Sequence, residues 1–203
     1  MTTLWRAASP LVLGSKSQVR RHLLEAAGIA VEVRPADVDE RAIEAAAPHL
    51  GPGAVAALLA REKALRVAAA LPGRLVVGAD QTLALGDRRF TKPADRDGAR
   101  AQLATLAGRS HALHAAVAVV CDGAILFEAV DRARLTMRAL SDEFLARYLD
   151  AAGDAVTASV GGYQLEGLGV QLFETIEGDH FTILGLPLLP LLAFLRAHGS
   201  LAA

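Results

Sequence analysis

The sequence has almost no cysteine and no excess of charge of either sign. Its one cysteine, Cys121, cannot form a disulfide within the chain and has no second thiol with which to hold a zinc ion. The 21 lysine and arginine residues almost balance the 22 aspartate and glutamate residues, which leaves a formal net charge of −1. These absences argue against a disulfide-stabilised secreted scaffold and against a protein that binds nucleic acid through bulk positive charge.

The sequence also lacks a long apolar run. The longest such stretch, Ile183 to Leu195, is shorter than the roughly 20 residues of a membrane-spanning helix, and Pro187 and Pro190 interrupt it. The first residues contain no apolar block of the kind found in a secretion signal. We therefore predict a cytoplasmic protein without a membrane partner. The composition, 53% hydrophobic and 21% charged over 203 residues, is typical of a folded globular protein.

The order of apolar strands and amphipathic helices predicts one α/β domain over residues 1–203. We expect a central mixed sheet with flanking helices and no separable linker, and two lobes around a cleft also fit this pattern. The expected strands are Leu11–Leu13, Ala30–Arg34, Leu75–Gly78, Ala112–Cys121, Ala124–Met137 and 170–173. The expected helices are Gln18–Ala27, 54–71, 95–107, Ser141–Ala151 and Leu188–Ala197, with an acidic loop at 37–40.

The sharpest chemical signal is Asp80, which we expect at the end of the buried run Leu75–Gly78. A buried carboxylate is costly unless a metal ion or a cationic side chain compensates it. Gly86 and Asp87 predict a two-residue hairpin turn, whose register would make Asp80 and Lys92 neighbours. The alternative interpretation is an aspartate that only caps a turn.

Positive charge collects at two further places. Ser17 is a suitable N-cap, so the loop that holds Ser15 leads into a helix N-terminus, with Arg20 one turn later. Such a terminus offers N–H groups and a positive dipole end to a phosphate. Lys63 lies on the long helix beside an apolar stripe that Glu62 interrupts. With the buried carboxylate, these segments suggest a phosphate site, while a solvated helix face and a lysine lying along apolar surface are the simpler alternatives.

Other nucleotide-binding and metal-binding patterns are missing. The loop 14–17 lacks the Walker A spacing, and the glycines at 161, 162, 167 and 169 do not form GxGxxG. His111 and His114 are three residues apart, so on a strand they face opposite sides and cannot hold one metal ion together. We expect both histidines at the wet surface. P-loop and dinucleotide-binding folds are therefore disfavoured.

Seven segments follow one another along the chain between Leu11 and Arg196. They are LVLGSKSQVRRHLL from Leu11, VDE at 38–40, LAREKA at 59–64, VVGADQTL from Val76, TKP at 91–93, GGYQLEGLG at 161–169 and GDHFTILGLPLLPLL at 178–192. Each piece alone is a weak signal, but the ordered set resembles the Maf family of nucleoside triphosphate pyrophosphatases.

The resemblance implies a Maf/Ham1-like (ITPase-like) α/β fold, with an elongated mixed sheet, flanking helices and two lobes around a cleft. It implies hydrolysis of the bond between the α and β phosphates of a nucleoside triphosphate, giving a monophosphate and pyrophosphate. The substrate would be a non-standard or modified nucleotide, removed in a house-cleaning role. A divalent metal cation, Mg²⁺ or Mn²⁺, is implied as cofactor, and a homodimer is compatible with the family.

The resemblance also assigns roles to positions of this chain. Asp80 matches the active-site aspartate, as general base or as metal ligand, and Glu40 matches the second metal-binding carboxylate. The family's phosphate-facing positions are occupied here by Ser15, Arg20, Lys63 and Lys92. We expect the two lysines to act in catalysis, because fixed positive charge stabilises the departing pyrophosphate.

Two positions bear on the substrate. Gln81 and Glu166 resemble the branch of the family that accepts 7-methyl-GTP, whereas the dTTP/UTP branch has threonine and glutamine there. A carboxylate at 166 would accept hydrogen bonds from the guanine N1–H and exocyclic amine. Gln18 and Val19 depart from the residues usual in the family, and Val19 falls at a position associated with base choice. The residues therefore lean toward a methylated purine without fixing the nucleotide.

Two other functions remain as alternatives. One is a nucleotide-binding regulator of cell division or septum formation with little turnover. The other is an unrelated α/β phosphatase, which would release orthophosphate. The pyrophosphatase is favoured because a metal-dependent hydrolase needs Asp80 together with Lys63 and Lys92, whereas a regulator does not.

Overall fold

The computed structural model describes residues 4–203, which form two compact units. The first unit holds the chain up to Gln81 together with His114–Asp131 and His180–Ala203. The second unit holds Thr82–Leu113 and Arg132–Asp179. Each unit is assembled from separate segments, so no single cut in the sequence separates the two. None of the helices within residues 4–203 has the length and apolar character needed to cross a membrane.

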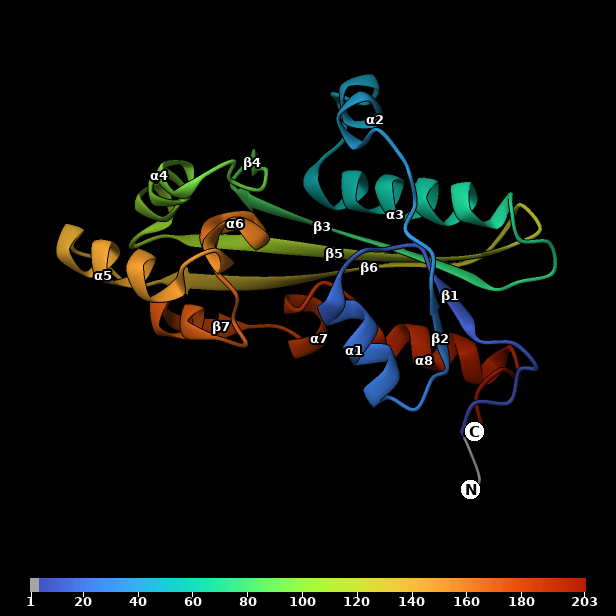
Figure 1. Ribbon diagram of the computed structural model, residues 1–203. Helices are drawn as coiled ribbons and strands as arrows, with labels where there is room; N and C mark the ends of the chain where they lie inside the picture. The colour runs from blue at the N-terminus through green and yellow to red at the C-terminus, as the bar shows by residue number, and fades with distance from the viewer. Residues whose placement is uncertain (1–3) are drawn as a thin grey trace. The chain divides into compact units, whose positions relative to one another are not determined.

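The chain forms a mixed sheet with helices (Figure 1). The strands are β1 (Leu11–Leu13), β2 (Val31–Val33), β3 (Val76–Leu85), β4 (Arg88–Phe90), β5 (Ser110–Cys121), β6 (Ala124–Met137) and β7 (Phe173–Glu177). The helices are α1 (Gln18–Ala26), α2 (Glu40–Ala46), α3 (Pro52–Ala68), α4 (Arg96–Leu106), α5 (Asp142–Ala152), α6 (Ala155–Ala158), α7 (His180–Ile183) and α8 (Leu188–Ala197), with 3₁₀ turns at Val160–Gly162 and Leu168–Leu172.

The strand order is β2-β1-β3-β5-β6-β7, and β4 pairs with β3. Strand β1 is parallel to β2 and β3, whereas the β3–β4 and β6–β7 pairs are antiparallel. A sheet with both kinds of pairing and flanking helices confirms the predicted α/β fold class.

The first unit has two apolar layers, one on each face of its strands. Successive residues of a strand point to opposite faces, so Leu11 and Leu13 pack with α1 and α8, whereas Val12 packs with α3. Figure 1 shows α3 on one side of these strands and α1 with α8 on the other. Strand β1 is therefore covered on both faces, which is why its three residues are all apolar and buried.

Helix α3 approaches β3 closely because Gly78 has no side chain. A Cβ atom at this position would lie 2.1 Å from the Ala60 carbonyl oxygen, far inside contact distance. The buried face of α3 carries several alanines together with Lys63, while Glu62 is only half-buried. The prediction that Glu62 interrupts the apolar face was wrong, because small alanines rather than the larger apolar residues define the contact with the sheet.

The second unit contains a buried aromatic cluster around His111. The Nε2 atom of His111 lies 2.7 Å from the Tyr163 hydroxyl oxygen, and the Phe173 ring packs against both side chains. Because His111 is only 2% exposed, the expectation of a wet surface histidine was wrong for this residue. Burial lowers the pKa of His111 to about 4, so the ring is neutral at neutral pH.

Many predicted boundaries agree with the structure. Strand β6 and helix α8 have the predicted bounds, and the hairpin turns at Gly86 and Asp87 with Leu85 opposite Arg88. Other predictions failed. The strand expected over Leu75–Gly78 continues as β3 to Leu85, and the strand expected near residues 170–173 is instead a 3₁₀ turn followed by β7. Helix α2 was not foreseen within the acidic segment.

Candidate active site

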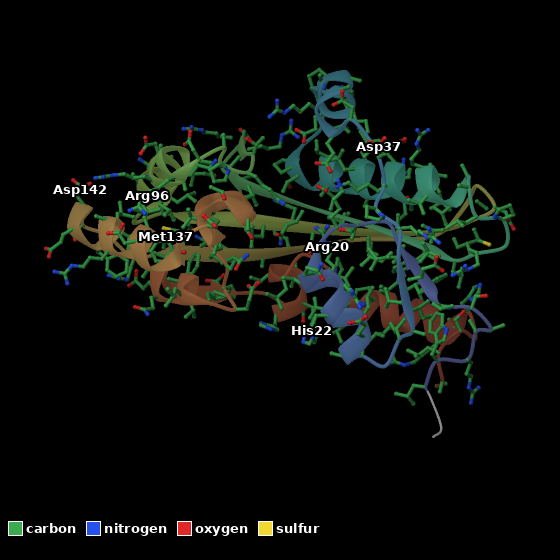
Figure 2. The ribbon with its side chains drawn as sticks, in the orientation of Figure 1. Arg20, His22, Asp37, Arg96, Met137 and Asp142 are labelled. Atoms are coloured by element: carbon green, nitrogen blue, oxygen red, sulfur yellow. The ribbon has the colours of Figure 1, made fainter. Side chains whose placement is uncertain are left out.

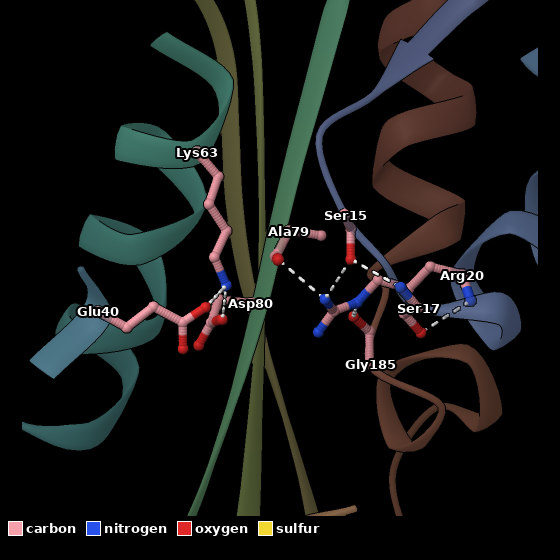
Figure 3. A network of polar contacts seen from close by, with 8 residues as sticks. All are labelled: Ser15, Ser17, Arg20, Glu40, Lys63, Ala79, Asp80 and Gly185. Atoms are coloured by element: carbon pink, nitrogen blue, oxygen red, sulfur yellow. Dashed lines mark hydrogen bonds and ion pairs between the residues drawn. The ribbon is translucent and has the colours of Figure 1, made fainter. Parts of the chain in front are cut away.

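Three charged side chains from three elements meet on the α3 side of strand β3. The Lys63 Nζ atom lies 2.5 Å from Asp80 Oδ1 and 2.7 Å from Glu40 Oε1 (Figure 3). Lys63 and Asp80 are each 8% exposed, whereas the Glu40 side chain is 51% exposed. One ammonium group thus faces two carboxylates, of which one is buried and the other open to solvent.

Asp80 lies in the middle of β3 and not at the end of a strand as predicted. The strand continues to Leu85 because its last residues pair with β4. The alternation of a strand places Asp80 on the same face as Gly78, which faces α3. The strand therefore aims a carboxylate directly at the helix that carries Lys63, and the turn-capping interpretation of Asp80 is excluded.

Glu40 is the first residue of α2. The Asp39 Oδ1 atom accepts a hydrogen bond from the backbone N–H of Ala42 at 3.0 Å, so Asp39 is the N-cap of this helix. An acidic residue in the first turn is also favoured by the helix dipole. The cap fixes the turn from which the Glu40 side chain reaches Lys63.

Hydrogen bonds of Ser15 and Ser17 stabilise the loop between β1 and α1. The Ser15 Oγ atom accepts hydrogen bonds from the Ser17 backbone N–H at 3.2 Å and from Arg20 Nη1 at 3.1 Å. The Ser17 Oγ atom accepts the Arg20 backbone N–H at 3.3 Å, which confirms the predicted N-cap. Arg20 is half-buried and reaches β3, whereas His22, on the same helix, is exposed (Figure 2).

The Arg20 guanidinium ties α1 to β3 and to the turn between α7 and α8. Its Nε atom donates to the Gly185 carbonyl oxygen at 2.7 Å, and its Nη1 atom donates to the Ala79 carbonyl oxygen at 2.9 Å (Figure 3). Burial lowers the pKa of Arg20, and the negative charges of Asp80 and Glu40 oppose that shift. Arg20 is therefore not part of a solvated helix face. Its charge interacts with the carboxylates of Asp80 and Glu40.

Gln81 holds the backbone of α7. Its Nε2 atom donates to the carbonyl oxygens of Thr182 and Ile183, both at 3.0 Å. The buried Thr182 hydroxyl donates in turn to Asp131 Oδ2 at 2.8 Å. Sequence reasoning missed the contact of Thr182 with Asp131, because the two residues lie 51 positions apart and no local pattern joins them. The structure thus gives Gln81 a positioning role next to Asp80.

Lys92 and Glu166 belong to the second unit. Both side chains are exposed. The β3–β4 ladder has the predicted register but ends at Leu83 and Phe90, short of Lys92. The expected approach of Lys92 to Asp80 and the substrate-binding role of Glu166 stay predictions. Ser15, Arg20, Glu40, Lys63, Asp80 and Gln81 all lie in the first unit.

Carboxylate oxygens in the first unit are potential ligands for a metal ion. Within residues 4–203, no three or more His, Cys, Asp or Glu side chains are grouped to hold one. Glu40 and Asp80 nevertheless direct two carboxylate oxygens at one point, marked by Lys63 Nζ. Mg²⁺ is usually held by one or two carboxylates, with substrate phosphates and water completing its coordination. The pair therefore fits a cation shared with a phosphate ligand.

Known proteins similar to this chain agree with the resemblance seen in the sequence. Residues 10–198 match the family described as Maf-like protein. A nucleoside triphosphate pyrophosphatase from Rhodopseudomonas palustris (strain HaA2) is 62% identical over 200 residues, which covers 98% of this chain and 99% of that protein. A 7-methyl-GTP pyrophosphatase from Rhizobium etli is 52% identical, covering 94% of this chain and 97% of that protein.

Among solved structures, a HAM1 protein from Coxiella burnetii aligns with a TM-score of 0.39 and 13% identity, covering 63% of this chain and 72% of that one. That similarity is too low to carry an argument.

Proposed function

Because this chain belongs to the Maf family, we propose that it is a nucleoside triphosphate pyrophosphatase, which releases pyrophosphate and a nucleoside monophosphate. The observation that carries this proposal is the cluster of Lys63, Asp80 and Glu40 in the same unit as the Ser15–Arg20 loop. Fixed cations and hydrogen-bond donors at a helix N-terminus suit a polyphosphate, and a neighbouring carboxylate suits the activation of water.

A divalent cation, Mg²⁺ or Mn²⁺, belongs to the proposal. Two carboxylates repel an incoming triphosphate, and a bound divalent ion would offset that repulsion. Glu40 and Asp80 would hold this ion. When bound, it would polarise a phosphoryl oxygen and make an attacking water more acidic.

The chain's own residues have separate roles in this proposal. Asp80 either accepts the proton of the attacking water or serves as metal ligand, and in the free protein Lys63 offsets its buried negative charge. Arg20 keeps the Ser15 loop in place and adds positive charge at a fixed point. Groups held in advance in this way stabilise the negative charge of departing pyrophosphate without reorganising. Lys92 would add a further cation.

We infer that the substrate is a modified nucleotide, with 7-methyl-GTP as the first candidate. The Rhizobium etli relative named for this nucleotide supports the choice. Glu166 supports it as well, because an exposed carboxylate is available to the N1–H and exocyclic amine of guanine.

The test is a product analysis. The purified protein is incubated with Mg²⁺ or Mn²⁺ and a panel of ordinary and methylated triphosphates, and pyrophosphate and orthophosphate are measured separately. We expect pyrophosphate, and we expect Asp80→Asn to lower turnover about 1,000-fold. Asp87→Asn is the matched control, since Asp87 is exposed in the hairpin turn. Orthophosphate alone, or full turnover by Asp80→Asn, would contradict the proposal, and nucleotide binding without turnover would favour a regulator.

A further inference from the structure

Lys63 occupies the place where the two proposed metal ligands converge. Its Nζ atom lies within 2.7 Å of a Glu40 oxygen and within 2.5 Å of an Asp80 oxygen. Figure 3 shows both carboxylates directed at this one nitrogen. The ammonium group therefore takes up the same oxygens that a divalent cation would need.

An ammonium group and a divalent cation cannot share this position. Two like charges at contact distance repel each other strongly, most of all where water is excluded. Lys63 is 8% exposed, so the space around its nitrogen is largely dry. A metal ion can reach both carboxylates only after the ammonium group has moved away.

Moving Lys63 away is costly unless another anion receives it. A buried ammonium that loses its partners is left uncompensated, which destabilises a protein severely. A nucleotide phosphate is an anion that would accept the ammonium group. The half-exposed Glu40 gives the exchange a starting point at the solvent side, because its contact with Lys63 can open without disturbing the buried Asp80.

We propose that Lys63 is an internal counter-cation, which occupies the metal position until a nucleotide draws the ammonium group onto its phosphates. This inference rests on the proposed function and extends it. Metal and nucleotide binding are then coupled, each raising the affinity for the other by the same factor. Without nucleotide, the carboxylates stay paired with Lys63 and bind the metal weakly.

The experiment measures Mn²⁺ binding with no turnover involved. The electron paramagnetic resonance signal of free Mn²⁺ is followed as wild type, Lys63→Met and Lys63→Gln are added without nucleotide at pH 8. We expect both variants to bind Mn²⁺ about 10-fold or more tightly than wild type, because the competing charge is gone. Arg66→Met is the matched control, since it removes an exposed cation from the same helix and should leave Mn²⁺ affinity unchanged.

A folded Lys63 variant that binds Mn²⁺ no more tightly than wild type would overturn the proposal. A second measurement needs no variant. Once the Mn²⁺ that the triphosphate binds by itself has been subtracted, wild type should bind Mn²⁺ about 10-fold or more tightly with an α,β-methylene triphosphate than without it, and equal affinity in the two cases would also overturn the proposal. Pyrophosphate release is assayed separately. A protein that shows the coupling but no turnover would contradict the proposed pyrophosphatase activity and leave the role of Lys63 intact.

Discussion

The two units bury ionisable groups in opposite ways. In the first unit, Lys63 and Asp80 are buried as an ion pair at 2.5 Å. In the second unit, His111 and Tyr163 are buried side by side as neutral groups, and burial lowers the pKa of His111 to about 4 and raises that of Tyr163. Buried charge persists only where a partner offsets its desolvation. The charged pair of the first unit can therefore interact with a charged ligand, whereas the neutral pair of the second unit contributes to packing.

The contrast shows that a shifted pKa does not by itself mark a chemical site. In the second unit, burial alone raises the pKa of Tyr148 to about 12, and no charged partner contributes. In the first unit, the carboxylates Asp80 and Glu40 act on the pKa of Arg20 against burial. A charged partner, more than the size of the shift, distinguishes the candidate site from the aromatic cluster.

The largest effect on the buried ion pair of the first unit is expected from forcing α3 away from β3. Gly78→Ala would place a methyl group against the Ala60 carbonyl oxygen, so the helix must move. We expect the free energy of unfolding to fall by about 3 kcal/mol, and turnover to fall because Lys63 shifts relative to Asp80. Urea denaturation and a pyrophosphate assay measure the two effects.

Gly51→Ala is the control for this change. Gly51 has an ordinary negative φ of −69°, and no atom outside its chain neighbours lies within 4 Å of the place where an added methyl group would stand, so its replacement should be tolerated. If Gly78→Ala were as stable and active as Gly51→Ala, the close approach of α3 would not be what holds the ion pair together.

Acid is expected to act on the second unit through His111. The pKa of His111 is lower in the folded chain than its ordinary value of 6.5, so the unfolded chain takes up the proton first as pH falls. The stability from the neutral ring is complete above pH 6.5 and is lost between there and about pH 4. We expect about 2 kcal/mol of this loss between pH 7 and pH 5, measured by urea denaturation at both values.

His111→Phe isolates that contribution. The variant loses the hydrogen bond to Tyr163 and is less stable at pH 7, but its stability should fall less between pH 7 and pH 5 than that of wild type. Identical pH dependence in variant and wild type would mean that His111 is not held neutral, and the contrast between the units would disappear.

The smallest effect is expected from removing the Gln81 side chain in the first unit. Gln81→Ala removes two hydrogen bonds to the backbone of α7, at a cost of about 1–2 kcal/mol. Hydrogen exchange of segment 180–186, followed by mass spectrometry, should become faster. Gln102→Ala is the control, because Gln102 bonds Thr91 and Gly161 in the second unit and should leave that segment unchanged. Unchanged exchange in Gln81→Ala would refute the positioning role of Gln81.

Local sequence signals predicted the parts of the fold that local physics decides. Ser17 caps its helix because a short hydroxyl side chain satisfies a free backbone N–H group there. The turn at Gly86 and Asp87 also follows from backbone geometry. The burial of His111 could not be predicted in this way, because Tyr163 and Phe173, which cover it, come from distant parts of the chain.

The candidate site shows the same division. The family resemblance is confirmed, and it points to Asp80, Glu40 and Lys63, which the structure brings into contact. The anchoring of α7 through Gln81 was not predicted. Its acceptors are backbone carbonyl oxygens, which every residue has, so no residue type in the sequence points to them.

The hydrogen bonds of Ser15 decide what kind of ligand atom this residue can meet. Its oxygen already accepts from the Ser17 N–H and from Arg20 Nη1, which uses the two lone pairs of a hydroxyl. Only the O–H proton remains, so Ser15 can donate to an incoming oxygen but cannot receive a proton donor. Ser15 therefore offers a donor to a bare phosphoryl oxygen and offers no acceptor to an amino group of the same nucleotide.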